Sequence, residues 1–297
     1  MSEPSKDEPP VKKFPTEYFG HPYSDLSKKA QEDRKNQSCS YLNGECKKPR
    51  KSEPKTKVGD CSIGYNCQVN ENGKIVKKFL PVIICPHRFK ENSVFDSVAE
   101  NYFGAGFVGK VVWVPEVSLG VGGSVDYVAI VRDDSDPSKI KDYVLVEFQA
   151  AGTTGTPWAA LQELKLKGKY EKDSYNYGIN WANEFLKTMM QQVYKKGPIA
   201  EALHRKIIFV IQDVGLEYIR NSCDASGLHE VRKTDQILFY TFRMQWNART
   251  GQWKLVFDNK YGTDFEGIRK ILSGSKQSEY PAEEEFIKNI QKKLKKS

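Results

Sequence analysis

The 297-residue sequence has no apolar run approaching the roughly 20 residues that a helix needs to cross a membrane. Its first fifteen residues are charged and contain prolines, which differs from the basic stub and apolar stretch of an export signal. These two absences predict a soluble, cytoplasmic protein with no membrane partner. With 39% hydrophobic and 12% aromatic residues, the chain has enough apolar material for a core.

A Cys-x-x-Cys pair, the tightest common spacing of thiolate metal ligands, is also missing. Six cysteines are nevertheless present, and five of them fall in the first third of the chain. The cytoplasm disfavours disulfides, so this clustering favours a thiolate metal site, with buried free thiols as the alternative. The five are Cys39, Cys46, Cys61, Cys67 and Cys85, while Cys223 stands alone.

Acidic residues are too few to balance the basic ones: 46 Lys and Arg face 38 Asp and Glu, a net charge of +8. This excess favours a polyanionic partner, and nucleic acid is the leading candidate. Basic residues crowd between Cys46 and Cys61, where a metal shared by these cysteines would hold the loop at both ends against phosphates. A solvated, mobile loop is the alternative.

Composition divides the chain into three segments. Residues 1–36 are polar and highly charged, which predicts an N-terminal arm with at most one short helix. Residues 37–90 contain the clustered cysteines but few apolar runs, so this segment needs an internal staple such as a metal. Residues 91–297 alternate helix-like and strand-like patterns, which predicts an α/β domain whose mixed central sheet is flanked by helices.

Periodicity places the elements of this domain. Apolar stripes predict helices over residues 94–103, 180–196 and 282–296, and a further helix beginning at Trp158. Apolar runs predict strands over residues 109–115, 126–131, 143–150 and 206–213, and a hairpin of residues 237–246 and 253–257.

Oxygen-bearing side chains interrupt these apolar strands. Glu147 and Gln149 project from the same face because they are two residues apart, and Asp126 on a neighbouring strand can lie beside them. Glu116 can face Asp126 across a glycine-rich turn. Carboxylates and phosphate oxygens bind hard cations such as magnesium, which activate water and neutralise phosphate charge. The pattern predicts a metal-dependent phosphodiesterase, and polar residues on the exposed face of a sheet are the alternative.

The order of elements resembles the PD-(D/E)xK nuclease core: a helix, the hairpin bearing Glu116 and Asp126, the run Glu147-Phe148-Gln149, then a helix and the strand 206–213. Upstream, Cys39-Ser40, Gly59-Asp60-Cys61-Ser62 and the run from Ile84 to Phe89 resemble the NotI type II restriction endonucleases, which carry a four-cysteine iron site before the catalytic core. The similarity extends from about Cys39 to Asp213, and no motif was matched beyond it.

This resemblance assigns roles to the strand residues. It implies that Asp126 and Glu147 hold magnesium together with the backbone carbonyl of Phe148. It also implies that Gln149 orients the attacking water, at a position where most of the superfamily has lysine. Because glutamine carries no positive charge, the metal, or an Arg or Lys from elsewhere, must neutralise more of the charge that develops on the phosphate.

Two sets of residues keep alternatives. Glu116 matches the acid that precedes the catalytic aspartate, but Glu100 on the preceding helix supplies that carboxylate in related cores. The family pattern selects four cysteines as ligands of a structural metal: Cys39, Cys46, Cys61 and Cys85. Cys67 is an alternative to Cys46, and four sulfur ligands suit zinc as well as iron.

The resemblance implies a homodimeric restriction endonuclease that makes magnesium-dependent double-strand cuts in a palindromic, GC-rich DNA site. Two other functions stay open at this point. One is a metal-stapled DNA-binding protein without catalysis, and the other is a repair-type or nonspecific nuclease with the same core.

Overall fold

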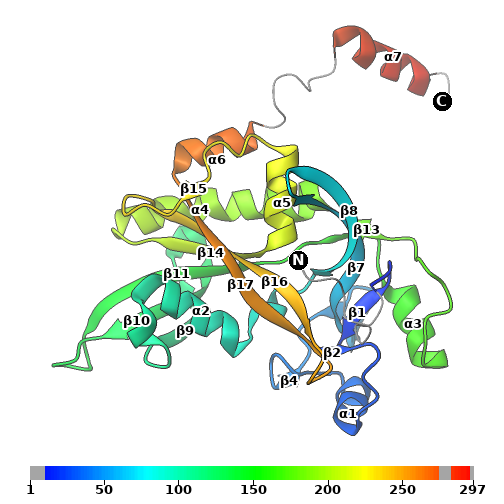
Figure 1. Ribbon diagram of the computed structural model, residues 1–297, viewed down its shortest axis with the longest axis horizontal. Helices are drawn as coiled ribbons and strands as arrows, with labels where there is room; N and C mark the ends of the chain where they lie inside the picture. The colour runs from blue at the N-terminus through cyan, green and yellow to red at the C-terminus, as the bar shows by residue number, and fades with distance from the viewer. Residues whose placement is uncertain (1–10, 274–281, 295–297) are drawn as a thin grey trace.

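A seven-stranded mixed sheet forms the centre of the protein (Figure 1). The computed structural model describes residues 11–273 and 282–294. The strand order is β15-β17-β16-β14-β11-β10-β9, in which β11, β14 and β16 run parallel and the other neighbours are antiparallel. The strands are β9 (Val112–Ser118), β10 (Ser124–Arg132), β11 (Ile140–Gln149), β14 (Ile207–Gln212), β15 (His229–Glu230), β16 (Ile237–Asn247) and β17 (Gln252–Thr263).

Helices cover both faces of this sheet, as Figure 1 shows. The buried strand β14 sends alternate side chains to opposite faces. Phe209 and Ile211 pack with α4, α5 and α6, whereas Ile208 and Val210 pack with α2. The predicted mixed α/β architecture is therefore confirmed. The helices are α2 (Asn92–Phe103), α4 (Thr188–Ala202), α5 (Asp213–Ser222) and α6 (Phe265–Leu272).

The strongest periodic patterns gave the right elements. The helix predicted for residues 94–103 is α2, and the predicted hairpin is the β16–β17 pair. The helix predicted for residues 180–196 consists of a π-helical segment, η4 (Trp181–Lys187), followed by α4. The C-terminal helix is α7 (Glu283–Leu294), and residues 295–296 of the prediction lie outside the described chain.

A second sheet, in the order β2-β1-β7-β8, corrects the prediction of an N-terminal arm. Residues 15–18 form β1, which pairs with β7, and Phe14 and Phe19 beside it are buried. The one short helix expected in the arm is present as α1 (Lys28–Asn36), capped by the Ser27 side chain. The strands of this sheet are β1 (Pro15–Tyr18), β2 (His21–Pro22), β7 (Asp60–Glu71) and β8 (Lys74–Ile83).

Arg88 joins the two sheets. Its side chain is fully buried, and its Nε donates to Glu17 of β1 at 2.9 Å. Its Nη2 donates to the carbonyl of Trp253 in β17 at 3.0 Å, and its Nη1 pairs with Glu91 at the start of α2. The guanidinium also lies over the Tyr41 ring, 4.5 Å from the centroid. One charged group thus connects β1, β17 and α2.

Shorter elements complete the described chain, and α7 stands apart from the rest of it (Figure 1). Within residues 11–273 and 282–294, no helix is long and apolar enough to span a membrane. The remaining helices and strands are β3 (Ser38–Cys39), β4 (Gly44–Glu45), β5 (Pro49–Arg50), β6 (Glu53–Lys57), η1 (Pro86–Phe89), η2 (Ala105–Phe107), η3 (Gly120–Gly122), β12 (Thr153–Thr154), α3 (Trp158–Lys167) and β13 (Gly178–Ile179).

Candidate active site

Three acidic residues align across the neighbouring strands β9, β10 and β11. Tyr127, the residue after Asp126, is paired with Pro115 of β9 and with Val146 of β11. Pro115 precedes Glu116, and Val146 precedes Glu147. Because both strand pairs are antiparallel, the next step in each register sets Asp126 between Glu116 and Glu147. The structure therefore places Asp126 beside Glu147, and the backbone of Glu116 lies on the other side of Asp126.

Backbone amides hold two of these carboxylates. The amide of Asp126 donates to Oε1 of Glu147 at 3.2 Å, and the amide of Phe148 donates to Oδ2 of Asp126 at 2.8 Å. The remaining oxygens, Oδ1 of Asp126 and Oε2 of Glu147, accept no hydrogen bond from the residues that the structure describes. Each acid thus keeps one oxygen for another partner.

Glu116 has an unusual backbone. Its φ is +53°, in the left-handed region that non-glycine residues seldom adopt, although it lies within strand β9. Such strain concentrates at functional sites. Glu100, the alternative acid, is an exposed residue of α2.

The structure adds a residue that sequence reasoning missed. Lys196 of α4 is only 4% exposed, and its Nζ lies 2.6 Å from Oε1 of Glu147 and 2.6 Å from the carbonyl oxygen of Ser124. The apolar stripe of the helix could have revealed it: Met189 and Val193 are buried on that stripe, and Lys196 follows at the next helical step. A lysine in such a position needs a buried partner.

A close approach of two segments positions this lysine. Gly122, in the turn before β10, lies against α4 so tightly that a Cβ there would be 2.3 Å from Cδ1 of Ile199. The same turn leads into Ser124, whose carbonyl accepts from Lys196. The turn that contains Gly122 therefore packs closely against α4, and a larger residue there would displace the Ile199 side chain.

Electrostatics confirm that Glu147 lies in an unusual environment. Burial and, to a smaller extent, the nearby Asp126 carboxylate raise the pKa of Glu147, Lys196 opposes both effects, and the net result is a pKa of about 7. His87 in η1 is close enough to sense the same acids. Burial and Lys90 lower the pKa of His87, and Asp126 and Glu116 oppose this.

Gln149 takes a different position from the acids. It is half-buried, and its Nε2 donates to the carbonyl of the next residue, Ala150, at 2.9 Å. Together with Gln212 and Trp181 it lines a small recess. Within residues 11–273 and 282–294, Gln149 shares no hydrogen bond with Asp126 or Glu147.

Four of the five clustered thiols lie within electrostatic reach of one another. A hydrogen bond with Cys61 lowers the pKa of Cys39 to about 7. Burial raises the pKa of Cys46 and of Cys85, and the charge of Cys39 adds to both. Cys67 belongs to a different apolar cluster, where burial and then Asp213 raise its pKa. The spatial grouping therefore separates Cys67 from the other four.

These groupings are not closed metal sites. In the part of the chain that the structure describes, no three His, Cys, Asp or Glu side chains are arranged to hold a metal ion together. Among the acids, Oε1 of Glu147 is already paired with Lys196, and Oδ2 of Asp126 accepts from a backbone amide. The magnesium site and the iron or zinc site stay predictions, for which the described residues 11–273 and 282–294 provide candidate donors without an assembled ligand set.

The basic loop between Cys46 and Cys61 is a folded hairpin of β5 and β6 rather than a mobile loop. Lys48 lies 2.9 Å from Oδ1 of the buried Asp60, and Lys57 lies 2.9 Å from Glu45. Arg50 packs over the Trp158 ring at 4.4 Å. Part of the positive charge expected to face phosphates is therefore used inside the protein.

The comparison with known families is decisive for the overall assignment. The family model "Restriction endonuclease NotI" matches residues 26–255. The chain belongs to the NotI restriction endonuclease family. As a NotI-type enzyme it is a type II, site-specific deoxyribonuclease, and its substrate is double-stranded DNA. No curated protein matches the chain.

The NotI match is longer than the resemblance recognised in the sequence, which ended near Asp213. It continues through β16 and into β17, so the hairpin that no motif covered is part of the family domain. It also spans the four grouped cysteines and all the aligned acids. The NotI match therefore begins at residue 26, inside the charged segment of residues 1–36.

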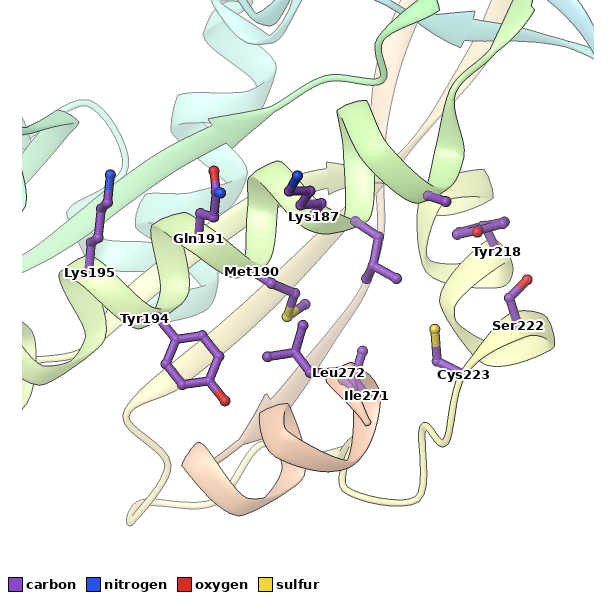
Figure 2. Close-up of a pocket in the computed structure, with 12 residues that line it drawn as sticks. Lys187, Met190, Gln191, Tyr194, Lys195, Tyr218, Ser222, Cys223, Ile271 and Leu272 are labelled. Atoms are coloured by element: carbon purple, nitrogen blue, oxygen red, sulfur yellow. The ribbon is translucent and has the colours of Figure 1, made fainter. Parts of the chain in front are cut away.

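An apolar pocket of about 510 Å³ lies among α4, α5 and α6, apart from the aligned acids (Figure 2). Figure 2 shows Met190 of α4 facing Ile271 and Leu272 of α6, with Lys195 and Tyr194 at one end. Helix α4 of this NotI-family enzyme thus places Lys195 in the lining of the pocket and the adjacent Lys196 against Glu147.

Proposed function

We propose that this NotI-family enzyme cuts both strands of a specific DNA site in a magnesium-dependent reaction at Asp126 and Glu147. The observation that carries the proposal is the alignment of these two acids, each held by a backbone amide of the neighbouring strand. The donors suit magnesium, because two carboxylates with one uncommitted oxygen each provide hard ligands and leave room for water and phosphate. The carbonyl of Phe148 would be the third protein ligand.

A magnesium ion held there supplies an activated water and neutralises charge on the phosphate. The protein's own residues would orient the reactants. Nε2 of Gln149 is committed to Ala150, which leaves Oε1 to accept a hydrogen bond from the attacking water and so to orient it. Glu116, across from Asp126, would serve as the further acid.

A homodimer acting on a palindromic, GC-rich site completes the proposal. Two-fold symmetry of the protein matches that of a palindrome and gives each strand its own cleavage centre. Helix α7 supports self-association, because a stripe of four large apolar side chains on it is exposed. The stripe consists of Phe286, Ile287, Ile290 and Leu294. The GC-rich character of the site rests on the family resemblance.

We also propose that Cys39, Cys46, Cys61 and Cys85 bind a structural iron or zinc ion. Support comes from their burial and mutual electrostatic influence, which Cys67 does not share. Four thiolates are a suitable donor set for either metal. The ion would stabilise the segment that holds the β5–β6 hairpin.

The test is cleavage of a plasmid and a phage genome by Asp126→Ala and Glu147→Ala variants, with magnesium or with a chelator. We expect discrete fragments from the wild type with magnesium alone, and a loss of at least 100-fold in either variant because a metal ligand is gone. Asp134→Ala, at an exposed turn, is the control and should cut normally.

End-mapping of the wild-type fragments gives the recognition site, and a gel shift with chelator shows that both variants still bind DNA. Full cleavage by either variant contradicts the assignment of the site. Smeared fragments would point to a nonspecific nuclease, and DNA binding without any cleavage would point to the non-catalytic binder, which the family match disfavours.

A further inference from the structure

Gln149 is neutral, so strand β11 itself brings no positive charge to Asp126 and Glu147. A lysine nevertheless reaches them from another element. We propose that Lys196 of α4 is a positioning residue that fixes the Glu147 carboxylate for cation binding. This inference rests on the proposed magnesium-dependent function of the same acids.

The contacts define the role. Nζ of Lys196 donates to Oε1 of Glu147 and to the Ser124 carbonyl, both at 2.6 Å. The amide of Asp126 donates to the same Oε1 at 3.2 Å. Two donors thus converge on one oxygen and leave Oε2 as the oxygen that can face a cation. Partners that orient a ligand in this way tune metal sites from behind the ligands.

The support for Lys196 is rigid on two sides. On one side, the close contact of Gly122 with Ile199 fixes the turn against α4. On the other side, Gly197 lies so near α6 that a Cβ there would be 2.8 Å from the Phe265 ring. Lys196 therefore sits on a helix segment that packs closely against two neighbours, and its two hydrogen bonds hold the ammonium group at Glu147.

A purely structural role explains this arrangement less well. Lys196 continues an apolar stripe, where leucine or methionine would pack without the cost of burying two charges. The side chain instead ends on Glu147, an acid that already has a backbone donor. An ammonium group has three donors, and two are used by described acceptors, so one remains for a water or a phosphate oxygen.

The experiment measures binding of Mn²⁺ to the full-length protein without DNA, by calorimetric titration, together with cleavage at varied Mg²⁺. The variants are Lys196→Met and Lys196→Arg, with Lys195→Met as the matched control because that neighbouring lysine is exposed and lines the apolar pocket. For Lys196→Met we expect Mn²⁺ affinity to fall 10- to 100-fold, the usual range for loss of such a partner, and the Mg²⁺ concentration for half-maximal cleavage to rise in parallel. Lys196→Arg should keep most of the affinity.

Wild-type affinity in Lys196→Met, or an equal loss in Lys195→Met, overturns the inference. Glu147→Ala is titrated in parallel. If this variant binds Mn²⁺ as the wild type does, Glu147 is not a metal ligand and the proposed function is wrong. If only Lys196→Met binds like the wild type, the proposed function stands and the inference about Lys196 is wrong. Thermal unfolding checks that each variant is folded. If Lys196→Met does not fold, Lys196→Gln takes its place, since its amide can donate to Glu147 without a charge, and the same outcomes decide.

Discussion

Asp213, the first residue of α5, is an acid in an unfavourable place for charge. Burial raises its pKa, a hydrogen bond from the amide of Val214 opposes this, the neighbouring Asp258 adds to it, and the net result is a pKa of about 7. The folded protein therefore prefers the protonated carboxyl group, and this preference stabilises it at low pH. The stabilisation is lost as pH rises from the unfolded pKa near 4 through the folded pKa near 7.

We therefore expect Asp213→Asn to be more stable than the wild type at pH 8, by about 1–2 kcal/mol, and to differ much less at pH 4.5. Asparagine keeps an oxygen for the amide of Val214 and cannot ionise. Differential scanning calorimetry at both pH values measures the difference, with Asp134→Asn as the exposed control. A difference in melting temperature that is the same at both pH values would show that the acid is not perturbed.

Single residues also show how far the sequence predicts the site. The placement of Asp126 beside Glu147 follows from strand alternation together with antiparallel pairing, both of which are local patterns. Helical periodicity places Lys196 on the buried side of α4. It does not identify the partner, Glu147, because that residue is 49 positions away. The contact of Gln149 with Ala150, and the left-handed backbone of Glu116, depend on tertiary packing that no pattern encodes.

At the scale of elements, the cysteines come from separate segments that fold together. Cys39 lies in β3, Cys61 is the second residue of β7, and Cys85 precedes η1. Cys61 and the Cys85 segment are neighbours, since the amide of Ile84 donates to the carbonyl of Cys61 at 3.0 Å. A metal at this junction would connect elements that local contacts alone do not join.

We expect the purified protein to contain about one iron or zinc ion per chain, and Cys61→Ala to lose it together with several degrees of melting temperature. Cys67→Ala is the matched control, because that thiol is equally buried but lies in another cluster. Elemental analysis by mass spectrometry measures the metal. Full metal content in Cys61→Ala would remove this residue from the ligand set.

Some elements were predictable and others were not. The β16–β17 hairpin has regular alternation on both sides of a turn, so sequence sufficed. Strand β1 has four residues between charged stretches, and it becomes a strand because β7, more than 40 residues away, supplies its partner. Tertiary pairing overrides weak local signals in such cases.

At the scale of the whole molecule, self-association remains to be measured. Light scattering on a sizing column should give about twice the 33.9 kDa chain mass for the wild type. Phe286→Asp combined with Ile290→Asp should give monomers, because two charges interrupt the exposed stripe of α7. Monomers should also nick a plasmid rather than linearise it.

Lys292→Asp, on the opposite side of α7, is the control and should leave the dimer intact. A wild type that stays monomeric over the accessible concentration range argues against the homodimer. A dimer that survives both apolar substitutions moves the contact surface away from α7.

The buried guanidinium of Arg88 holds the two sheets of the enzyme at a fixed relative position. Its hydrogen bonds link β1, β17 and the start of α2, so they join the β2-β1-β7-β8 sheet to the sheet that carries the acids. DNA bound against the β2-β1-β7-β8 sheet would then lie at a fixed distance from Asp126 and Glu147. In the proposed function, the fold itself would set how far the cut lies from the bases that this sheet contacts.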